Sequence, residues 1–148
     1  MTARYVHLEI PSVVTMLKVV DSVCEEFGSL AGLDEDGVHC LSASVREATA
    51  NAIRHGNGND QEKPVRLSFE VATTSPARVV VRILDQGRGF QPEAVADPVA
   101  PDNLSMTGGR GLFLMRAFMD DVEVRCLPDG GTEIVLSKHI GQNAGQVT

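Results

Sequence analysis

The 148-residue sequence has a deficit of basic residues, no long apolar run and only three cysteines. Thirteen Lys and Arg against 20 Asp and Glu give a net charge of −7, which argues against a surface built to bind DNA or RNA. No apolar stretch approaches the roughly 20 residues that cross a bilayer, and the N-terminus lacks the apolar core of a signal peptide. We therefore expect no direct contact with nucleic acid and no membrane association.

The cysteines Cys24, Cys40 and Cys126 are odd in number and far apart in the chain. A disulfide framework or a zinc site is therefore not expected, and reduced thiols in a cytoplasmic protein are the simpler interpretation. The apolar fraction of 43% and the charged fraction of 22% are typical of a globular protein. We expect a single domain over residues 1–148, with a polar, frayed tail from about residue 141.

The spacing of apolar residues predicts a strand, two helices, two strands, a third helix and two closing strands. The expected strands are Arg4–Ile10, Val65–Thr73, Arg78–Leu84, Val122–Leu127 and Thr132–Leu136. The first helix is expected to open at Pro11 and to stop at Gly28, and residues Gln91–Thr107 are expected to form a lid or binding loop. This order predicts an α+β sandwich of two layers, with one mixed, mostly antiparallel sheet and its helices on a single face.

The second expected helix carries an unusual line of polar residues. Ser44, Glu47, Asn51 and His55 are three or four residues apart, so they project from one face beside an alanine-rich stripe. A solvated helix face is the commoner explanation of such a line. A functional face is the alternative, and this helix alone does not decide between them.

The almost wholly apolar strand Val79–Leu84 leads directly into Asp85-Gln86-Gly87-Arg88-Gly89. A carboxylate at the end of a buried strand can accept a hydrogen bond from an exocyclic amine such as that of adenine. The glycines allow backbone to approach a flat ligand. A plain turn would use the same residue types, so this motif is also ambiguous alone.

The third motif, Gly108-Gly109-Arg110-Gly111-Leu112, opens the last expected helix. Glycine-rich backbone at a helix N-terminus offers unpaired N–H groups and a positive dipole end, which suit phosphate. No Gly-Lys-Ser/Thr follows, so the segment is not a Walker A loop. Together, the three motifs predict one glycine-rich nucleotide site.

The order of these motifs resembles the GHKL ATPase superfamily, whose members share the Bergerat ATP-binding fold. Glu47–Asn51 match the N box, Asp85–Gly89 the first glycine box, Gly109–Gly111 the second, and Gly131-Thr132 the terminal motif. Over almost the whole chain, the sequence looks most like the bacterial anti-sigma factor serine kinases. It lacks the histidine-bearing dimerisation segment of sensor histidine kinases and the transducer domain of the gyrase, chaperone and mismatch-repair members.

The resemblance implies a role for each matching residue. Glu47 would be the catalytic base, Asn51 would bind Mg²⁺ through its amide oxygen, and Asp85 would bind the adenine amino group with help from Thr132. The remaining cofactor-binding residues shape the pocket or hold phosphate; they are Gly87, Gly89, Gly109, Arg110, Gly111 and Leu112. Some relatives carry an arginine where this chain has Thr107, and the sequence leaves open whether Arg110 or Arg88 replaces it.

The implied activity is that of an ATP- and Mg²⁺-dependent serine/threonine-protein kinase that acts in transcription regulation. It would phosphorylate a serine of an anti-anti-sigma (STAS-type) protein and, as an anti-sigma factor, would sequester a sigma factor. The resemblance also implies a homodimer, for which strand Arg4–Ile10 offers an edge, and partner contact through a basic residue, for which Lys18 is the nearest match. An ordinary solvated lysine explains Lys18 equally well.

Two alternatives to the kinase keep the nucleotide site. One is a catalytically silent module that binds a partner in an ATP-dependent manner. The other is an ATPase that uses Glu47 to activate water. Glu47 favours the kinase over the silent module, because a pure binder has no need of that carboxylate. The ATPase is less favoured, because we expect no second domain within residues 1–148 that could use hydrolysis for motion.

Overall fold

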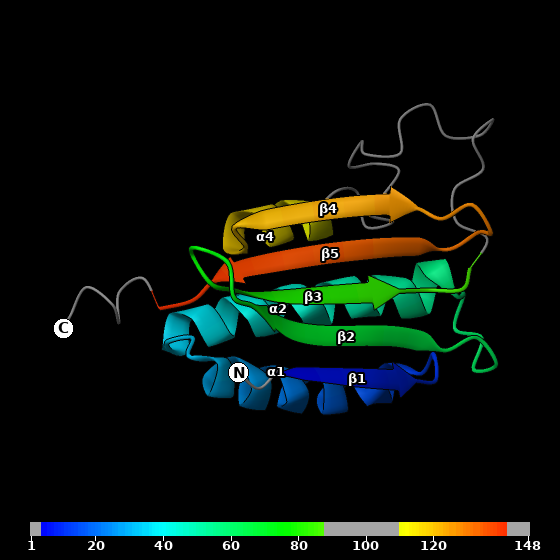
Figure 1. The fold of residues 1–148 in the computed structure, drawn as a ribbon. Coiled ribbons are helices and arrows are strands. Elements are labelled where there is room, and N and C mark those ends of the chain that lie inside the picture. The colour runs from blue at the N-terminus through cyan, green and yellow to red at the C-terminus, as the bar shows by residue number, and fades with distance from the viewer. Residues whose placement is uncertain (1–3, 88–109, 142–148) are drawn as a thin grey trace.

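The computed structural model describes residues 4–87 and 110–141. In chain order the elements are β1 (Tyr5–Ile10), η1 (Val14–Met16), α1 (Leu17–Ala31), α2 (Glu35–Asn51), the π-helix η2 (Ala52–Gly56), β2 (Val65–Ala72), β3 (Arg78–Leu84), α4 (Arg110–Phe118), β4 (Asp121–Cys126) and β5 (Thr132–His139). The five strands form one sheet in the order β1-β2-β3-β5-β4, and each pairing is antiparallel. Helices α1, α2 and α4 lie together against one face of this sheet (Figure 1), which confirms the two-layer α+β sandwich. The expectation of a mixed sheet is wrong for the described residues, in which every strand pairing is antiparallel.

The sheet faces its helices with alternate residues of each strand. Val6, Leu8 and Ile10 of β1 pair in register with Phe69, Leu67 and Val65 of β2, and all six contribute to the core. In the central strand β3, Val79, Val81 and Ile83 are buried, as its apolar sequence predicts. The antiparallel pairing of β3 with β5 places the end of β3 beside the start of β5, where the Asp85 N–H donates to the Thr132 carbonyl over 3.1 Å.

Helix α1 does not stop at Gly28, so that expectation is wrong. The helix continues to Ala31 and ends at Gly32, whose φ of 107° is the left-handed conformation that glycine adopts readily. Gly28 lies inside the helix where α1 meets α2, and a β-carbon there would be 3.3 Å from Val38 and 3.4 Å from Leu41. The glycine therefore permits close packing of two helices and does not end the first.

Helix α2 begins at a side-chain cap. The Asp34 carboxylate accepts a hydrogen bond from the Gly37 N–H over 2.8 Å, and Glu35 and Asp36 favour the same helix end by their charge. The predicted apolar stripe is buried at Leu41, Val45, Ala48 and Ala52. Because this stripe packs against the sheet and α1, it fixes which side of α2 presents Glu47 and Asn51.

The expected lid, Gln91–Thr107, and the expected tail from residue 142 onward lie outside the described residues. Within residues 4–87 and 110–141, no helix is both long and apolar enough to span a bilayer.

Candidate nucleotide site

The start of α4 lies against the polar line of α2. A β-carbon on Gly111, in the first turn of α4, would be 2.5 Å from Glu47 Oε2 and 3.1 Å from Asn51 Nδ2. The absent side chain of Gly111 therefore lets these two helices bring their polar groups together. Residues that match the N box and residues that match the second glycine box thus form one cluster.

Burial excludes a simple solvated face for most of the polar line on α2. Ser44 is fully buried, Asn51 is only 8% exposed, and Glu47 is half-buried. The neighbouring Arg46 forms an ion pair with Asp21 of α1, on the side away from α4. His55 departs from the pattern because it is exposed, and its pKa is lowered by partial desolvation and by the charge of Arg54.

Two groups at the start of α4 are of a kind that could bind phosphate and a hard cation. Helix α4 is nine residues long, and the N–H groups of its first turn have no partner within the helix, so they suit phosphate oxygens. The amide oxygen of Asn51 is a hard ligand of the kind that Mg²⁺ prefers. Mg²⁺ keeps several waters and takes further ligands from phosphates, so one protein oxygen beside a phosphate-binding helix end fits this ion.

Asp85 forms the second part of the site, immediately after β3. The residue is 8% exposed, and its Oδ1 accepts hydrogen bonds from the Gly87 and Thr132 N–H groups, both over 3.1 Å. Burial raises the pKa of this carboxyl, and the two N–H donors offset part of that effect. With Oδ1 held by backbone, Oδ2 can accept a hydrogen bond from a ligand amine.

A π-helical turn joins the two parts. The last turn of the long helix widens into η2, Ala52–Gly56, and this turn places Gly56 against the segment Asp85–Gly87. A β-carbon on Gly56 would overlap the Asp85 carboxylate, and one on Gly87 would overlap the Gly56 carbonyl oxygen. Single π-turns inside helices are often found at functional sites, and here the turn allows two backbone segments to touch.

Replacing Gly87 with alanine should destabilise the fold by about 1–3 kcal/mol, the usual cost of overpacking a well-packed position. The new β-carbon meets the backbone carbonyl of Gly56 and has no flexible side chain to displace. Urea unfolding should show a lower midpoint with an unchanged slope.

Gly58→Asn is the matched control for the Gly87 variant. It changes a glycine two residues from Gly56, at φ 62°, where the added β-carbon has open space and asparagine tolerates the left-handed backbone. An unfolding midpoint equal to wild type for Gly87→Ala would contradict the close approach of the two segments.

The terminal motif also lies at Asp85. Gly131 has a φ of 90°, and a β-carbon there would be 2.5 Å from the Asp85 carbonyl oxygen, while Thr132 is partly exposed beside the carboxylate.

Leu112 contributes a buried side chain and Arg110 an exposed one. The structure thus places six predicted residues in two clusters, with Glu47, Asn51 and Gly111 in one and Asp85, Gly87 and Thr132 in the other; Arg110 and Leu112 flank Gly111 at the start of α4. Thr107, Gly108, Gly109, Arg88 and Gly89 lie outside the described residues.

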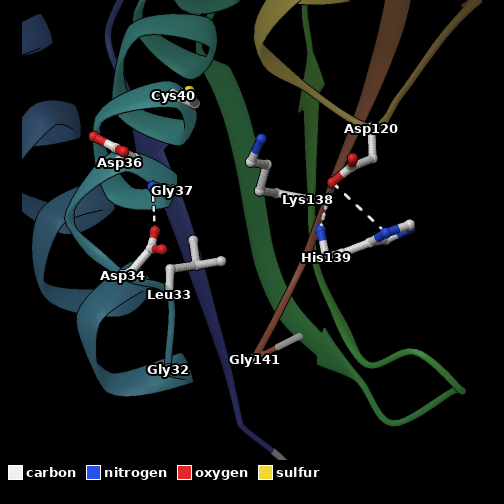
Figure 2. Close-up of a pocket in the computed structure, with 10 residues that line it drawn as sticks. All are labelled: Gly32, Leu33, Asp34, Asp36, Gly37, Cys40, Asp120, Lys138, His139 and Gly141. Carbon is white, nitrogen blue, oxygen red and sulfur yellow. Dashed lines mark hydrogen bonds and ion pairs between the residues drawn. The ribbon is translucent and has the colours of Figure 1, made fainter. Parts of the chain in front are cut away.

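A polar cavity of about 310 Å³ lies elsewhere in the fold (Figure 2). It lies between the start of α2 and the end of β5, with Asp36 and Cys40 on one side and Lys138 and His139 on the other. Lys138 Nζ donates to the Phe118 carbonyl over 2.8 Å, and the His139 N–H donates to Asp120 over 2.7 Å. Because the 17-residue α2 spans about 25 Å, this cavity is separate from the cluster at Asn51.

The sequence matches the family model described as histidine kinase-like ATPase domain over residues 10–138. Serine-protein kinase RsbW of Staphylococcus epidermidis is 29% identical over 146 residues, which cover 94% of this chain and 89% of that protein. The Bacillus subtilis protein of the same name is 26% identical over 144 residues, or 93% of this chain and 87% of its relative.

Two solved structures are similar to this chain in their fold. The RsbU and RsbW domains of a Mycobacterium tuberculosis protein match 92% of this chain and 32% of that chain, with a TM-score of 0.67 and 17% identity. The histidine kinase domain of a blue-light activated histidine kinase from Erythrobacter litoralis matches 92% of this chain and 64% of that one, with a TM-score of 0.56 and 16% identity. The chain belongs to the histidine kinase-like ATPase domain family.

Proposed function

We propose that this protein is an anti-sigma factor with serine-protein kinase activity. It transfers the γ-phosphoryl group of ATP to a serine of an anti-anti-sigma (STAS-type) protein and, when that protein is not available, sequesters a sigma factor. The observation that carries the proposal is the meeting of Glu47 and Asn51 with Gly111 at the start of α4. Relatives named serine-protein kinase match more than nine-tenths of the chain, which supports the same activity.

In this proposal ATP binds across both clusters. Asp85 Oδ2 accepts a hydrogen bond from the adenine amino group, and Thr132 assists it from β5. The first-turn N–H groups from Arg110 to Leu112 hold phosphate, while Gly87 and Gly111 allow the segments on either side of the site to pack closely. Asn51 holds Mg²⁺, which neutralises charge on the phosphates when it is bound.

Glu47 serves as the general base in the phosphoryl transfer. The hydroxyl oxygen of the substrate serine attacks the γ-phosphorus, its proton passes to the Glu47 carboxylate, and ADP leaves. The half-buried carboxylate lies against Gly111, beside the first turn of α4, so it is close to where the phosphates would bind. Its principal contribution is to hold the hydroxyl in line, since phosphoryl transfer depends mostly on positioning and electrostatic stabilisation.

Phosphorylation then switches the partner. A phosphoserine adds about −1.5 to −2 charges to the anti-anti-sigma protein, which disfavours a packed contact with this acidic chain and frees the kinase for the sigma factor. The exposed Lys18 on α1 is our candidate for partner contact, and the outer edge of β1 is our candidate for homodimer pairing.

The direct test is to incubate the protein with radiolabelled ATP, Mg²⁺ and a purified STAS-type protein, and to follow label on the latter. Transfer to a serine is the expected result. ATP binding without any transfer would replace the kinase with a partner-binding module. Release of inorganic phosphate at the same rate with and without the STAS-type protein would instead indicate an ATPase that activates water.

A further inference from the structure

Asn57, the first residue after the π-turn, is the centre of a buried hydrogen-bond network. The residue is 3% exposed, and its Oδ1 accepts a hydrogen bond from the Gln86 N–H over 2.7 Å. Its Nδ2 donates to Ser12 Oγ over 2.9 Å and to the carbonyls of Lys63 and Pro64 over 2.8 and 3.2 Å. One side chain thus connects the entry to α1, the loop before β2 and the end of β3.

The chemistry of the network fixes the orientation of the amide. Carbonyl groups of Lys63 and Pro64 accept only, so Nδ2 must face them, and the Gln86 N–H requires the oxygen. Ser12, itself buried, donates its hydroxyl to the Lys63 carbonyl over 2.6 Å and therefore offers its oxygen to Asn57. Every polar atom of the Asn57 side chain is matched, which makes this a rigid connection.

The contact with Gln86 acts directly on the peptide that follows Asp85. The Asp85 carboxylate depends on backbone for its direction, because Oδ1 is held by the N–H of Gly87, two residues further along the chain, and by the N–H of Thr132. Fixing the Gln86 N–H fixes the peptide plane between Asp85 and Gln86. The same bond also holds the π-turn against this segment, where Gly56 and Gly87 touch.

We propose that Asn57 is a positioning residue for base recognition: through the Gln86 N–H it holds the Asp85 carboxylate in the direction that selects a 6-amino purine. This inference rests on the proposed ATP-binding function and adds a residue that no motif match assigns. Asn57 does not touch the base. It acts through Asp85, so its loss should reduce discrimination between bases more than it reduces binding of the phosphates.

The test compares binding of ATP and inosine triphosphate, which differ at the 6-position of the purine. Asn57→Ala should reduce the preference for ATP over inosine triphosphate by about 3- to 10-fold, the effect of losing the one hydrogen bond between Asp85 and the 6-amino group. Binding of inosine triphosphate should change little. Ser12→Ala removes the opposite end of the network and should keep the preference. A preference in Asn57→Ala equal to wild type would overturn the role of Asn57.

A second variant and a second readout keep the test decisive if Asn57→Ala is too unstable to assay. Asn57→Asp keeps an oxygen for the Gln86 N–H and loses the donors, so it should retain the preference despite a lower unfolding midpoint; loss of the preference would overturn the proposal. Amide hydrogen exchange in the free protein should show faster exchange at Gln86 in Asn57→Ala and wild-type exchange in Ser12→Ala. A wild-type protein that binds neither triphosphate would overturn the proposed function itself, and with it the role in base selection.

Discussion

Glu47→Gln should reduce the initial rate of phosphoryl transfer by about 10²- to 10⁴-fold, the range that general base catalysis contributes. Glutamine keeps the length of the side chain and the space beside Gly111, but it cannot take up the proton of the substrate hydroxyl. ATP affinity should change by less than about 2-fold, because the phosphates are held by the start of α4 and by Mg²⁺. The measurement is single-turnover transfer of labelled phosphate to the STAS-type protein, together with equilibrium binding of ATP.

Glu26→Gln is the matched control for this variant. It removes a glutamate carboxylate from an exposed position of α1, so the net charge changes by the same amount as in Glu47→Gln while the α2–α4 cluster is untouched. Transfer at the wild-type rate by Glu47→Gln would remove Glu47 as the base. If that variant instead lost ATP binding and transfer in parallel, the carboxylate would belong to the nucleotide site and not to the chemical step.

Much of the fold could be predicted because apolar periodicity reports burial directly. Strand β3 was expected and found over Arg78–Leu84, and the apolar stripe of α2 lies in the core as its spacing predicts. Gly28 shows where this reasoning fails. A glycine near the end of a helical pattern resembles a stop, and only the position of Val38 and Leu41 on the next helix reveals that it serves packing.

The site residues that belong to one short sequence motif could be predicted. The contacts between segments that are distant in the sequence could not. Asp85 and Gly111 belong to motifs that can be found in the sequence. The contribution of Gly56 and Asn57 depends on a π-turn and on a partner 29 residues away, so it appears only in the folded chain. In the sequence, Gly56 and Asn57 indicate no more than the end of a helix.

The second large effect is expected at Asp85. Asp85→Asn should weaken ATP binding by about 10- to 100-fold, because a hydrogen bond to a charged group contributes roughly 1.5–3 kcal/mol. The backbone N–H groups of Gly87 and Thr132 require an oxygen, so the asparagine oxygen takes the Oδ1 position. The new amide nitrogen then faces the adenine amino group, donor against donor. Titration with ATP measures the loss.

The same variant should be more stable than wild type at neutral pH. Burial raises the pKa of Asp85 in the folded protein above its value of 3.8 in the unfolded chain, so between these two pKa values the folded state binds more protons. The contribution of Asp85 to the free energy of unfolding is therefore highest below pH 3.8 and falls as the pH rises through the folded-state pKa. Asparagine carries no charge and does not pay this cost of burial.

The difference in the free energy of unfolding between Asp85→Asn and wild type at each pH isolates the contribution of this residue from those of the other carboxyl groups. The difference in unfolding free energy should grow in favour of the variant through the acid range and then remain constant. Asp129→Asn, which removes a carboxylate from an exposed turn position close to Thr132 and outside the Asp85 hydrogen bonds, is the matched control for this comparison. A variant that is less stable than wild type at pH 7 would mean that the ionised carboxylate stabilises the fold. A variant that is more stable and binds ATP poorly would identify Asp85 as a residue that costs stability and serves recognition.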